Sequence, residues 1–205
     1  MILSNWFAMH PDAWTEKDLV LSVTTDTIGK NACLLSVTAS RTHGRQVAPE
    51  TLFVAGGNVN GNREITEIDP KEYEEKALGR SACEENLKKL LTGVKMIVSY
   101  SVSYYTGKVL AQTFPTVFNN YPILDVVNLA RVQSAGLLQE ALSNATDASS
   151  LIYWIENKAM NVSGNGKLQD NLALYSLENV GAGLPAYKKR NSQVAALFNT
   201  LMVVQ

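Results

Sequence analysis

The sequence predicts an α/β fold with a mixed sheet, in which three antiparallel strands precede parallel strands and helices cover both faces. Three observations predict it. Segments rich in β-branched and aliphatic residues come first, short apolar runs then alternate with helical patterns, and the last third of the chain is helical in pattern. Of the 205 residues, 46% are apolar and 18% are charged, which is typical of a packed globular domain and excludes a disordered chain.

The first predicted elements form an antiparallel meander. Residues 19–25 and 33–39 are rich in Leu, Val and Thr, which favours strands, and residues 26–31 between them have the composition of a turn. Residues 52–54 form a third short strand before a glycine pair. We therefore expect three consecutive strands joined by short connections.

Helix and strand patterns alternate in the next part of the chain. Asp69 and Pro70 begin a helix that reaches Leu78, and Ser81 with Glu84 has the spacing of a capping box at the start of another helix. Residues 94–98 form a short apolar run of the kind found in buried parallel strands.

The pattern then repeats and becomes helical. A helix is predicted over residues 104–112 and a strand over 121–124, and Asp125 stands where it caps the helix that follows. Three more helices are predicted near the C-terminus, over residues 151–160, 168–180 and 194–203.

Charge and cysteine content limit the classes of partner. Eighteen Lys and Arg against nineteen Asp and Glu give a net charge of −1, so no global positive field attracts nucleic acid or an anionic membrane. No apolar run is long enough to span a bilayer, and Met1 to Met9 lack the basic residue of a secretory signal. Cys33 and Cys83 are predicted to be small buried residues in a reducing compartment, which indicates a cytoplasmic protein without a membrane partner.

Several stretches carry a family resemblance through their order and spacing. They are residues 19–27 (Leu-Val-Leu-Ser-Val-Thr-Thr-Asp-Thr), 84–100, 121–131 (Tyr-Pro-Ile-Leu-Asp-Val-Val-Asn-Leu-Ala-Arg), 175–180, 183–185 and 194–198. In this order they resemble the DnaQ-like 3′ to 5′ exonucleases of the RNase H-like superfamily, from about Leu19 to Leu201. The resemblance implies an RNase H-like domain over residues 19–205, preceded by an aromatic-rich extension over residues 1–18.

The resemblance also implies a site for two divalent metal ions about 4 Å apart, which activate a water molecule and stabilise the leaving oxygen. Such ions need oxygen ligands, chiefly carboxylates. The family supplies an Asp and a Glu on the first strand, an Asp in the second motif and an Asp on the last helix. On this sequence the first two positions fall on Ser22 and Thr24, and the third falls on Tyr104.

The position on the last helix depends on the register. It is Arg190 if the pair Leu197 and Phe198 sets the register, and Asn191 if Tyr187 stands for the family's Tyr. Neither residue is an acid. The form of the site that uses His is excluded as well, because no His follows residue 43.

With all four carboxylates replaced, we predict a catalytically inactive member of the fold that has no metal and no other cofactor. An alternative is an active 3′ to 5′ exonuclease that uses Mg²⁺ or Mn²⁺. In that case the first strand is slipped so that Asp26 becomes a ligand, although Ile28 then takes the Glu position.

Two noncatalytic functions compete. A site of Ser22, Thr24, Tyr104 and Tyr187, beside the basic run Lys188, Lys189 and Arg190, favours weak binding of single-stranded nucleic acid. The other candidate is a protein-interaction or scaffold module, with a protein partner or a homodimer. It is indicated by large apolar residues at two places, Trp6, Phe7, Met9 and Trp14 near the N-terminus and Tyr153 with Trp154 in the helical tail.

Overall fold

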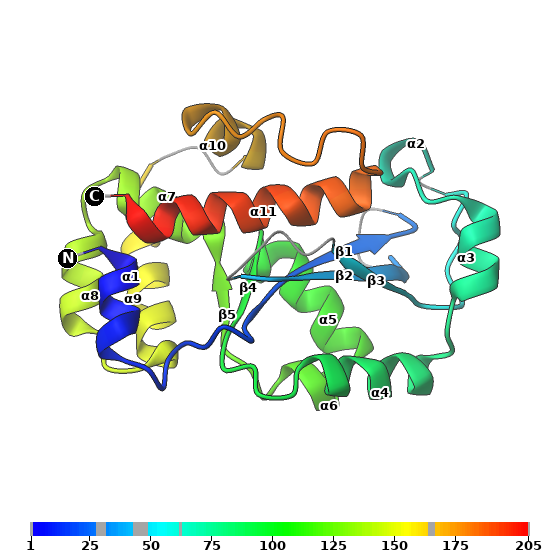
Figure 1. The fold of residues 1–205 in the computed structure, drawn as a ribbon, viewed down its shortest axis with the longest axis horizontal. Coiled ribbons are helices and arrows are strands. Elements are labelled where there is room, and N and C mark those ends of the chain that lie inside the picture. The colour runs from blue at the N-terminus through cyan, green and yellow to red at the C-terminus, as the bar shows by residue number, and fades with distance from the viewer. Residues whose placement is uncertain (1, 28–31, 43–48, 62, 164–166, 205) are drawn as a thin grey trace.

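A five-stranded mixed sheet forms the centre of the molecule. The computed structural model describes residues 2–27, 32–42, 49–61, 63–163 and 167–204, without the side chains of residues 103 and 104. Within these residues the strands are β1 (Leu19–Thr25), β2 (Leu34–Arg41), β3 (Glu50–Phe53), β4 (Ile97–Ser99) and β5 (Ile123–Asp125), in the order β3-β2-β1-β4-β5 (Figure 1). β1, β2 and β3 pair antiparallel, whereas β4 and β5 run parallel to β1. The predicted mixed sheet is confirmed.

Helices cover both faces of this sheet. They are α1 (Leu3–Met9), α2 (Arg63–Thr66), α3 (Pro70–Lys76), α4 (Arg80–Leu90), α5 (Gly107–Thr113), α6 (Pro115–Phe118), α7 (Val126–Ser134), α8 (Leu138–Asn144), α9 (Ala148–Met160), α10 (Leu168–Leu174) and α11 (Ala186–Val203), with one π-helical turn at Val102–Thr106. The long helix α11 crosses one face together with α1, α7 and α9, while α4, α5 and α6 cover the other (Figure 1). No helix in these described ranges combines the length and hydropathy that a bilayer span requires.

Strand β1 contributes to both cores because its side chains alternate between the two faces. Val20 packs in the core beneath α11, whereas Leu19 and Leu21 pack in the core beneath α4 and α5. By the same period of two, Ser22 and Thr24 lie on the face that α11 covers. The two predicted site positions on this strand therefore share one face.

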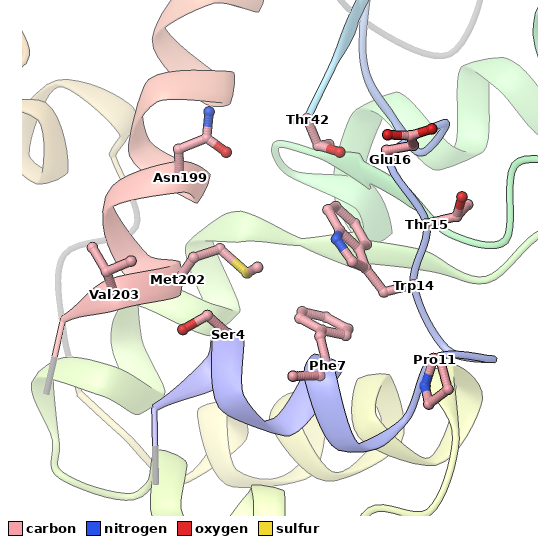
Figure 2. Close-up of a pocket in the computed structure, with 11 residues that line it drawn as sticks. Ser4, Phe7, Pro11, Trp14, Thr15, Glu16, Thr42, Asn199, Met202 and Val203 are labelled. Carbon is pink, nitrogen blue, oxygen red and sulfur yellow. The ribbon is translucent and has the colours of Figure 1, made fainter. Parts of the chain in front are cut away.

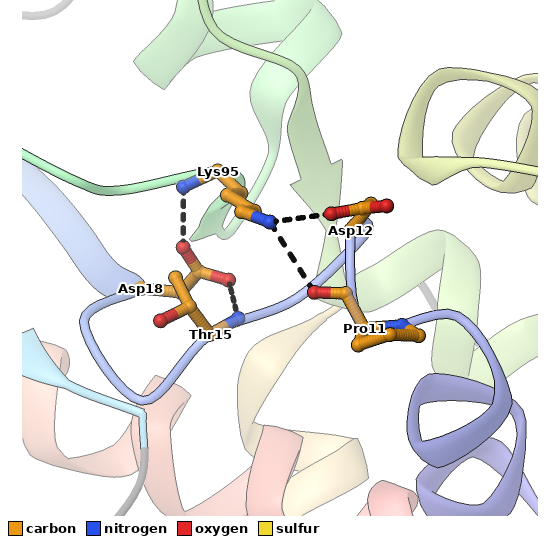
Figure 3. Close-up of polar contacts among 5 residues, drawn as sticks. All are labelled: Pro11, Asp12, Thr15, Asp18 and Lys95. Carbon is orange, nitrogen blue, oxygen red and sulfur yellow. Dashed lines mark hydrogen bonds and ion pairs between the residues drawn. The ribbon is translucent and has the colours of Figure 1, made fainter.

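A buried carboxylate anchors the N-terminal segment to the sheet (Figure 3). Asp18 accepts hydrogen bonds from the backbone N–H groups of Thr15 (2.8 Å) and Lys95 (2.6 Å). It also accepts one from the backbone N–H of Met96 (3.1 Å). The ammonium group of Lys95 reaches Asp12 at 3.1 Å. Burial is the main influence on Asp18 and raises the pKa of its carboxyl group. These contacts fix the chain just before β1 against the start of β4.

The N-terminal aromatic residues are part of the protein's own core. Trp6, Phe7 and Trp14 are buried with residues of α11, and Trp14 lies 5.3 Å from Phe198 between ring centroids. Met9 instead stays 56% exposed. These three aromatic side chains are therefore used in folding and are not available to a partner. The division of the chain at residue 18 stays a prediction.

Several predicted element ends are corrected. The helix predicted over residues 168–180 ends at Leu174, where Ser176 adopts a left-handed φ of 56°. The helix predicted over residues 194–203 already begins at Ala186, directly after Pro185, where Glu67 accepts a hydrogen bond from the Ala186 N–H at 2.9 Å.

The predicted capping box at the start of α4 is also wrong. The helix begins after Gly79 with no side-chain cap. The carboxylate of Glu84 instead pairs with Lys88 at 2.8 Å and accepts a hydrogen bond from Thr116. The spacing matched a capping box, but Ser81 lies inside the helix and the Glu84 carboxylate is used by Lys88 of the same helix and by Thr116.

One cysteine prediction is wrong. Cys83 is buried, as expected, whereas Cys33 is exposed at the start of β2. The backbone N–H of Cys33 donates to the Asp26 carboxylate at 2.8 Å, which holds Cys33 beside the residue that follows β1, just before β2 begins. Both thiols are free.

Candidate functional site

A groove opens where β1 and β4 end beside the N-terminal part of α11. It consists of two adjoining hollows of about 180 and 240 Å³ that share Val23, Tyr105 and Arg190, and we call it the β1–β4 groove. The smaller hollow is also lined by Ser22, Ser99, Tyr100, Ser101 and Thr106, and the larger one by Thr24, Thr25, Ile65, Thr66, Ala186 and Tyr187. Ser22 and Thr24, the two predicted site positions on β1, are among these residues.

Hydroxyl groups dominate the groove, and several of them are held by the backbone. Ser99 donates to the carbonyl of Leu21 at 2.7 Å, and Thr106 donates to the carbonyl of Tyr100 at 2.8 Å. The hydroxyls of Thr25 and Tyr105 hydrogen-bond to each other across the larger hollow. The groove is therefore a preformed surface of hydroxyls and aromatic rings.

Asp125 does not line the groove but holds the backbone segments that form one of its walls. Its carboxylate caps α7 through the N–H of Val127 at 3.0 Å, as the sequence predicts. It also accepts hydrogen bonds from the N–H groups of Ser101 (3.2 Å) and Val102 (2.8 Å), which begin the π-helical turn. Ser101 adopts a left-handed φ of 57° there. Burial raises the pKa of Asp125, and the carboxylate does not line the groove.

The geometry separates the two candidate positions on the last helix. Arg190 lines both hollows and is exposed, on the same side of the sheet as Ser22. Asn191 is fully buried, and its amide nitrogen donates to the carbonyls of Val20 (3.0 Å) and Thr38 (2.9 Å). Asn191 thus ties α11 to the sheet, and Arg190 is the residue of this pair that a ligand in the groove would meet.

The other predicted binding residues are only partly brought together. Tyr187 lines the larger hollow but is buried against Phe53, and burial together with the nearby Glu72 carboxylate raises the pKa of its phenol to about 12. Lys188 lies 5.7 Å above the Tyr187 ring, and neither Lys188 nor Lys189 lines the groove. Of the basic run, Arg190 alone faces it.

Tyr104 and Asp26 are the remaining predicted site residues. The part of the chain that the structure describes does not include the side chain of Tyr104 or any part of Ile28. Asp26, the alternative metal ligand, accepts hydrogen bonds from the N–H groups of Cys33 (2.8 Å) and Asn58 (3.1 Å) and so holds two loops together. It lines neither hollow.

The donor set of the groove does not suit a pair of divalent metal ions. Among the described residues that line it, Arg190 is the only charged one, and it is a cation. The described part of the chain contains no group of three or more His, Cys, Asp or Glu side chains that could hold a metal ion. Hydroxyl groups and a guanidinium do not offset the cost of dehydrating Mg²⁺.

Four residues of the groove were not predicted from the sequence: Ser99, Ser101, Tyr105 and Thr106. Ser99 and Ser101 had a usable signal, because they stand at the carboxyl end of an apolar strand where ligands commonly bind. Tyr105 had none. A π-helical turn changes the direction of successive side chains, and this turn is held by the distant Asp125.

A larger hollow of about 540 Å³ lies at the other end of α11, between α1 and the segment that leads to β1. Figure 2 shows the rings of Phe7 and Trp14 on one side and Met202 on the other. Phe7 and Trp14 stack at 4.9 Å between ring centroids, so each ring covers one face of the other. We assign no role to this hollow.

No protein-family model matches the sequence, and no curated protein matches it. Solved structures do match. One is exonuclease I in complex with the inhibitor BCBP, with a TM-score of 0.60 and 14% identity over 92% of this chain and 41% of that chain.

Two further matches are also exonuclease I. The E. coli exonuclease I complex with a dT13 oligonucleotide has a TM-score of 0.56 and 15% identity over 88% of this chain and 40% of that one. The ExoI/SSB-Ct complex has a TM-score of 0.55 and 15% identity over 90% and 42%. The chain thus spans about two fifths of the length of these proteins. At such identity the likeness establishes an exonuclease-like fold and nothing about the site.

Proposed function

We propose that this chain is a noncatalytic RNase H-like domain of the DnaQ-like type, and that it binds single-stranded nucleic acid weakly in the β1–β4 groove. The observation that carries the proposal is the position of Arg190. A guanidinium faces the groove at the position where one of the two registers, the one set by Leu197 and Phe198, places the family's metal-binding Asp. The groove therefore has a donor for phosphate in place of ligands for a metal ion.

The chemistry of the lining supports binding without cleavage. Arg190 presents a planar set of donors that fits a phosphate, and the Tyr105 ring lines both hollows where a base can stack. Stacking contributes about 1–3 kcal/mol per base and does not depend on sequence. With one cation and no carboxylate pair, the site is suited to weak, salt-sensitive binding.

We also propose that the protein acts in the cytoplasm. Both cysteines are free thiols, and Cys33 is exposed. Exposed free thiols persist in reducing compartments. Expressing the chain in the periplasm and mapping thiol modification would test this, since we expect Cys33 to be oxidised or capped there but free in the cytoplasm.

The direct test of binding uses fluorescence anisotropy with a labelled oligo-dT. We expect Arg190→Glu to weaken binding about ten-fold or more, because a phosphate contact becomes a repulsion. The matched control is Lys89→Glu. It makes the same change of charge at an exposed residue of α4, on the opposite face of the sheet, and should leave affinity nearly unchanged.

Salt dependence and catalysis complete the test. Each phosphate contact with a single strand contributes about −0.7 to the slope of log K against log salt concentration. The slope measured for Arg190→Glu should therefore be shallower than that of the wild type by about 0.7. Mn²⁺ titration by calorimetry should show no stoichiometric binding, and the labelled strand should stay intact. Cleavage with bound metal would establish the active-nuclease alternative. Folded protein that binds no oligonucleotide would refute the proposal.

The protein-interaction alternative now rests on one of its two sites, since the N-terminal aromatic residues are buried. On α9, Tyr153 is 60% exposed and Met160 is 81% exposed, at a spacing that places both on one face of the helix. If this face joins two copies of the chain, sedimentation equilibrium should show a dimer that Tyr153→Glu dissociates. A monomer at all concentrations would exclude the homodimer.

A further inference from the structure

Thr25 connects the end of β1 to the aromatic ring that lines both hollows of the β1–β4 groove. It is buried, and its hydroxyl forms a hydrogen bond with the phenol of Tyr105. The same hydroxyl donates to the backbone carbonyl of Thr27 at 2.7 Å. Because a threonine hydroxyl has only one hydrogen, the Tyr105 phenol is the donor in its bond to Thr25. The two bonds form a chain with one direction, from Tyr105 through Thr25 to Thr27.

An irregularity in the sheet aims Thr25 at the groove. The pairing of β1 with β2 shifts register between Thr24, which lies opposite Ser36, and Thr25, which lies opposite Leu34. Successive side chains of a regular strand point to opposite faces, whereas Thr24 and Thr25 both line the larger hollow. Bulges of this kind redirect side chains beside binding sites.

Tyr105 is held at three places. Its backbone belongs to the π-helical turn, whose first N–H groups are bound by Asp125. Its ring packs against the core beneath α4 and α5, and its hydroxyl is bound by Thr25. The ring is nevertheless only half-buried and lines both hollows. A ligand in the groove therefore meets a ring of fixed orientation.

A fixed ring favours a flat group that stacks on it, because binding does not have to order the ring first. The larger hollow adds apolar surface from Val23, Ile65 and Ala186, and Ile65 is 57% exposed. Arg190 stands between the two hollows, since it lines both of them. The larger hollow thus suits an unpaired base whose phosphate lies on Arg190.

We propose that Thr25 is a positioning residue of the β1–β4 groove, and that the groove recognises its ligand through an unpaired base stacked on Tyr105. This inference rests on the proposed function, because it concerns the same groove, and it adds the chemical group that the strand must offer. The phosphates bind through Arg190 with or without a base. The base contributes only while Thr25 holds the ring.

Fluorescence anisotropy with two labelled strands of equal length tests the inference. One strand is oligo-dT, and the other is an abasic strand with the same phosphates. We expect the wild type to bind oligo-dT about ten-fold more tightly than the abasic strand. Thr25→Val keeps the shape of the side chain but removes its hydroxyl, so it should weaken binding of oligo-dT about five-fold and leave binding of the abasic strand unchanged. Thr25→Ser keeps the hydroxyl and should bind both strands as the wild type does.

Tyr105→Phe tests the other end of the same hydrogen bond. It keeps the ring and removes the hydroxyl, so it should reproduce the loss caused by Thr25→Val, and the double variant should bind no more weakly than either single variant. The matched control is Thr51→Val. It removes a hydroxyl that pairs with Thr38 at 3.1 Å between β2 and β3, outside the groove, and should change neither affinity.

Nuclear magnetic resonance of the free protein provides a measurement that needs no nucleic acid. The hydroxyl proton of Tyr105 should exchange with water more slowly in the wild type than in Thr25→Val. An equal exchange rate in the two proteins would show that Thr25 does not hold the ring, and it would overturn the inference.

The binding data separate this inference from the proposed function. The inference alone is overturned if the wild type binds both strands equally, or if Thr25→Val binds oligo-dT as tightly as the wild type does. Equal weakening of both strands in Thr25→Val would also overturn it, because the role of Thr25 would then be purely structural. A folded wild type that binds neither strand would refute the inference and the proposed function together.

Discussion

At the scale of single residues, Asp125 links the fold to the groove. One carboxylate serves three backbone N–H groups, one at the start of α7 and two at the start of the π-helical turn. Asp125→Ala removes a helix cap and leaves two further N–H groups without their acceptor. We expect a loss of about 2–4 kcal/mol in the free energy of unfolding, measured with urea.

The control for this substitution is Asp147→Ala. Asp147 also caps a helix, α9, through the Ser150 N–H at 2.8 Å, but it is exposed and serves no second segment. It should cost only about 1 kcal/mol. Equal losses in the two variants would show that the contacts to residues 101 and 102 contribute nothing to stability.

The Asp125 carboxylate should also make the free energy of unfolding depend on pH. Because burial raises the pKa of Asp125 above its ordinary value of 3.8, the folded protein binds this proton more tightly than the unfolded chain does. Stability should therefore fall as pH rises from that value through the raised pKa. Asp18 acts in the same direction. Urea titrations over this range should give a smaller decline for Asp125→Ala than for the wild type, and an equal decline would contradict the assignment.

Asn191 provides a second test at this scale. Asn191→Asp would turn a donor that serves the carbonyls of Val20 and Thr38 into a buried acceptor facing them. We expect a loss of about 3–5 kcal/mol in thermal or urea unfolding, with no gain of Mn²⁺ binding. Asn199→Asp makes the same change at an exposed position of α11 and should be nearly neutral. A stable Asn191→Asp protein that binds Mn²⁺ would instead place the lost metal ligand at this residue.

At the scale of elements, α1 shows how the N-terminal segment is held. Trp6 is 1% exposed in the core that α11 shares, whereas Met9 on the same helix is 56% exposed. Trp6→Ala should lower the free energy of unfolding by about 3–5 kcal/mol, because it leaves a cavity between helices. Met9→Ala should change it by no more than about 0.5 kcal/mol. Similar values for both would mean that α1 does not pack on the sheet in solution.

Element positions followed from the sequence more readily than element ends did. The strand predicted over residues 19–25 has the same bounds in the structure, because a run of Leu, Val and Thr between polar residues is a local signal. The start of α11 at Ala186 was missed because it depends on Glu67, which is distant in sequence. Contacts of that kind leave no trace in a local pattern.

At the scale of the whole molecule, one sheet joins two cores. β1 places alternate side chains in each, so neither core should survive the loss of the other. We expect a single unfolding transition in which tryptophan fluorescence and far-ultraviolet circular dichroism coincide. All three tryptophans report on the α11 side, since Trp6 and Trp14 lie in that core and Trp154 packs against it. Transitions that separate would show that the α4 side unfolds independently.

Pattern and composition were enough to predict the mixed α/β class, the strand that carries Ser22 and Thr24, and the absence of acids at the positions where the family resemblance expects them. These depend on side-chain period and residue identity, which are local properties. Three relations could be seen only in the folded chain: Arg190 and not Asn191 faces the groove, Tyr105 lines it, and Thr25 binds the Tyr105 hydroxyl. Those relations arise where helices distant in sequence pack on one sheet, because a residue's neighbours across an interface depend on packing geometry that no local pattern encodes.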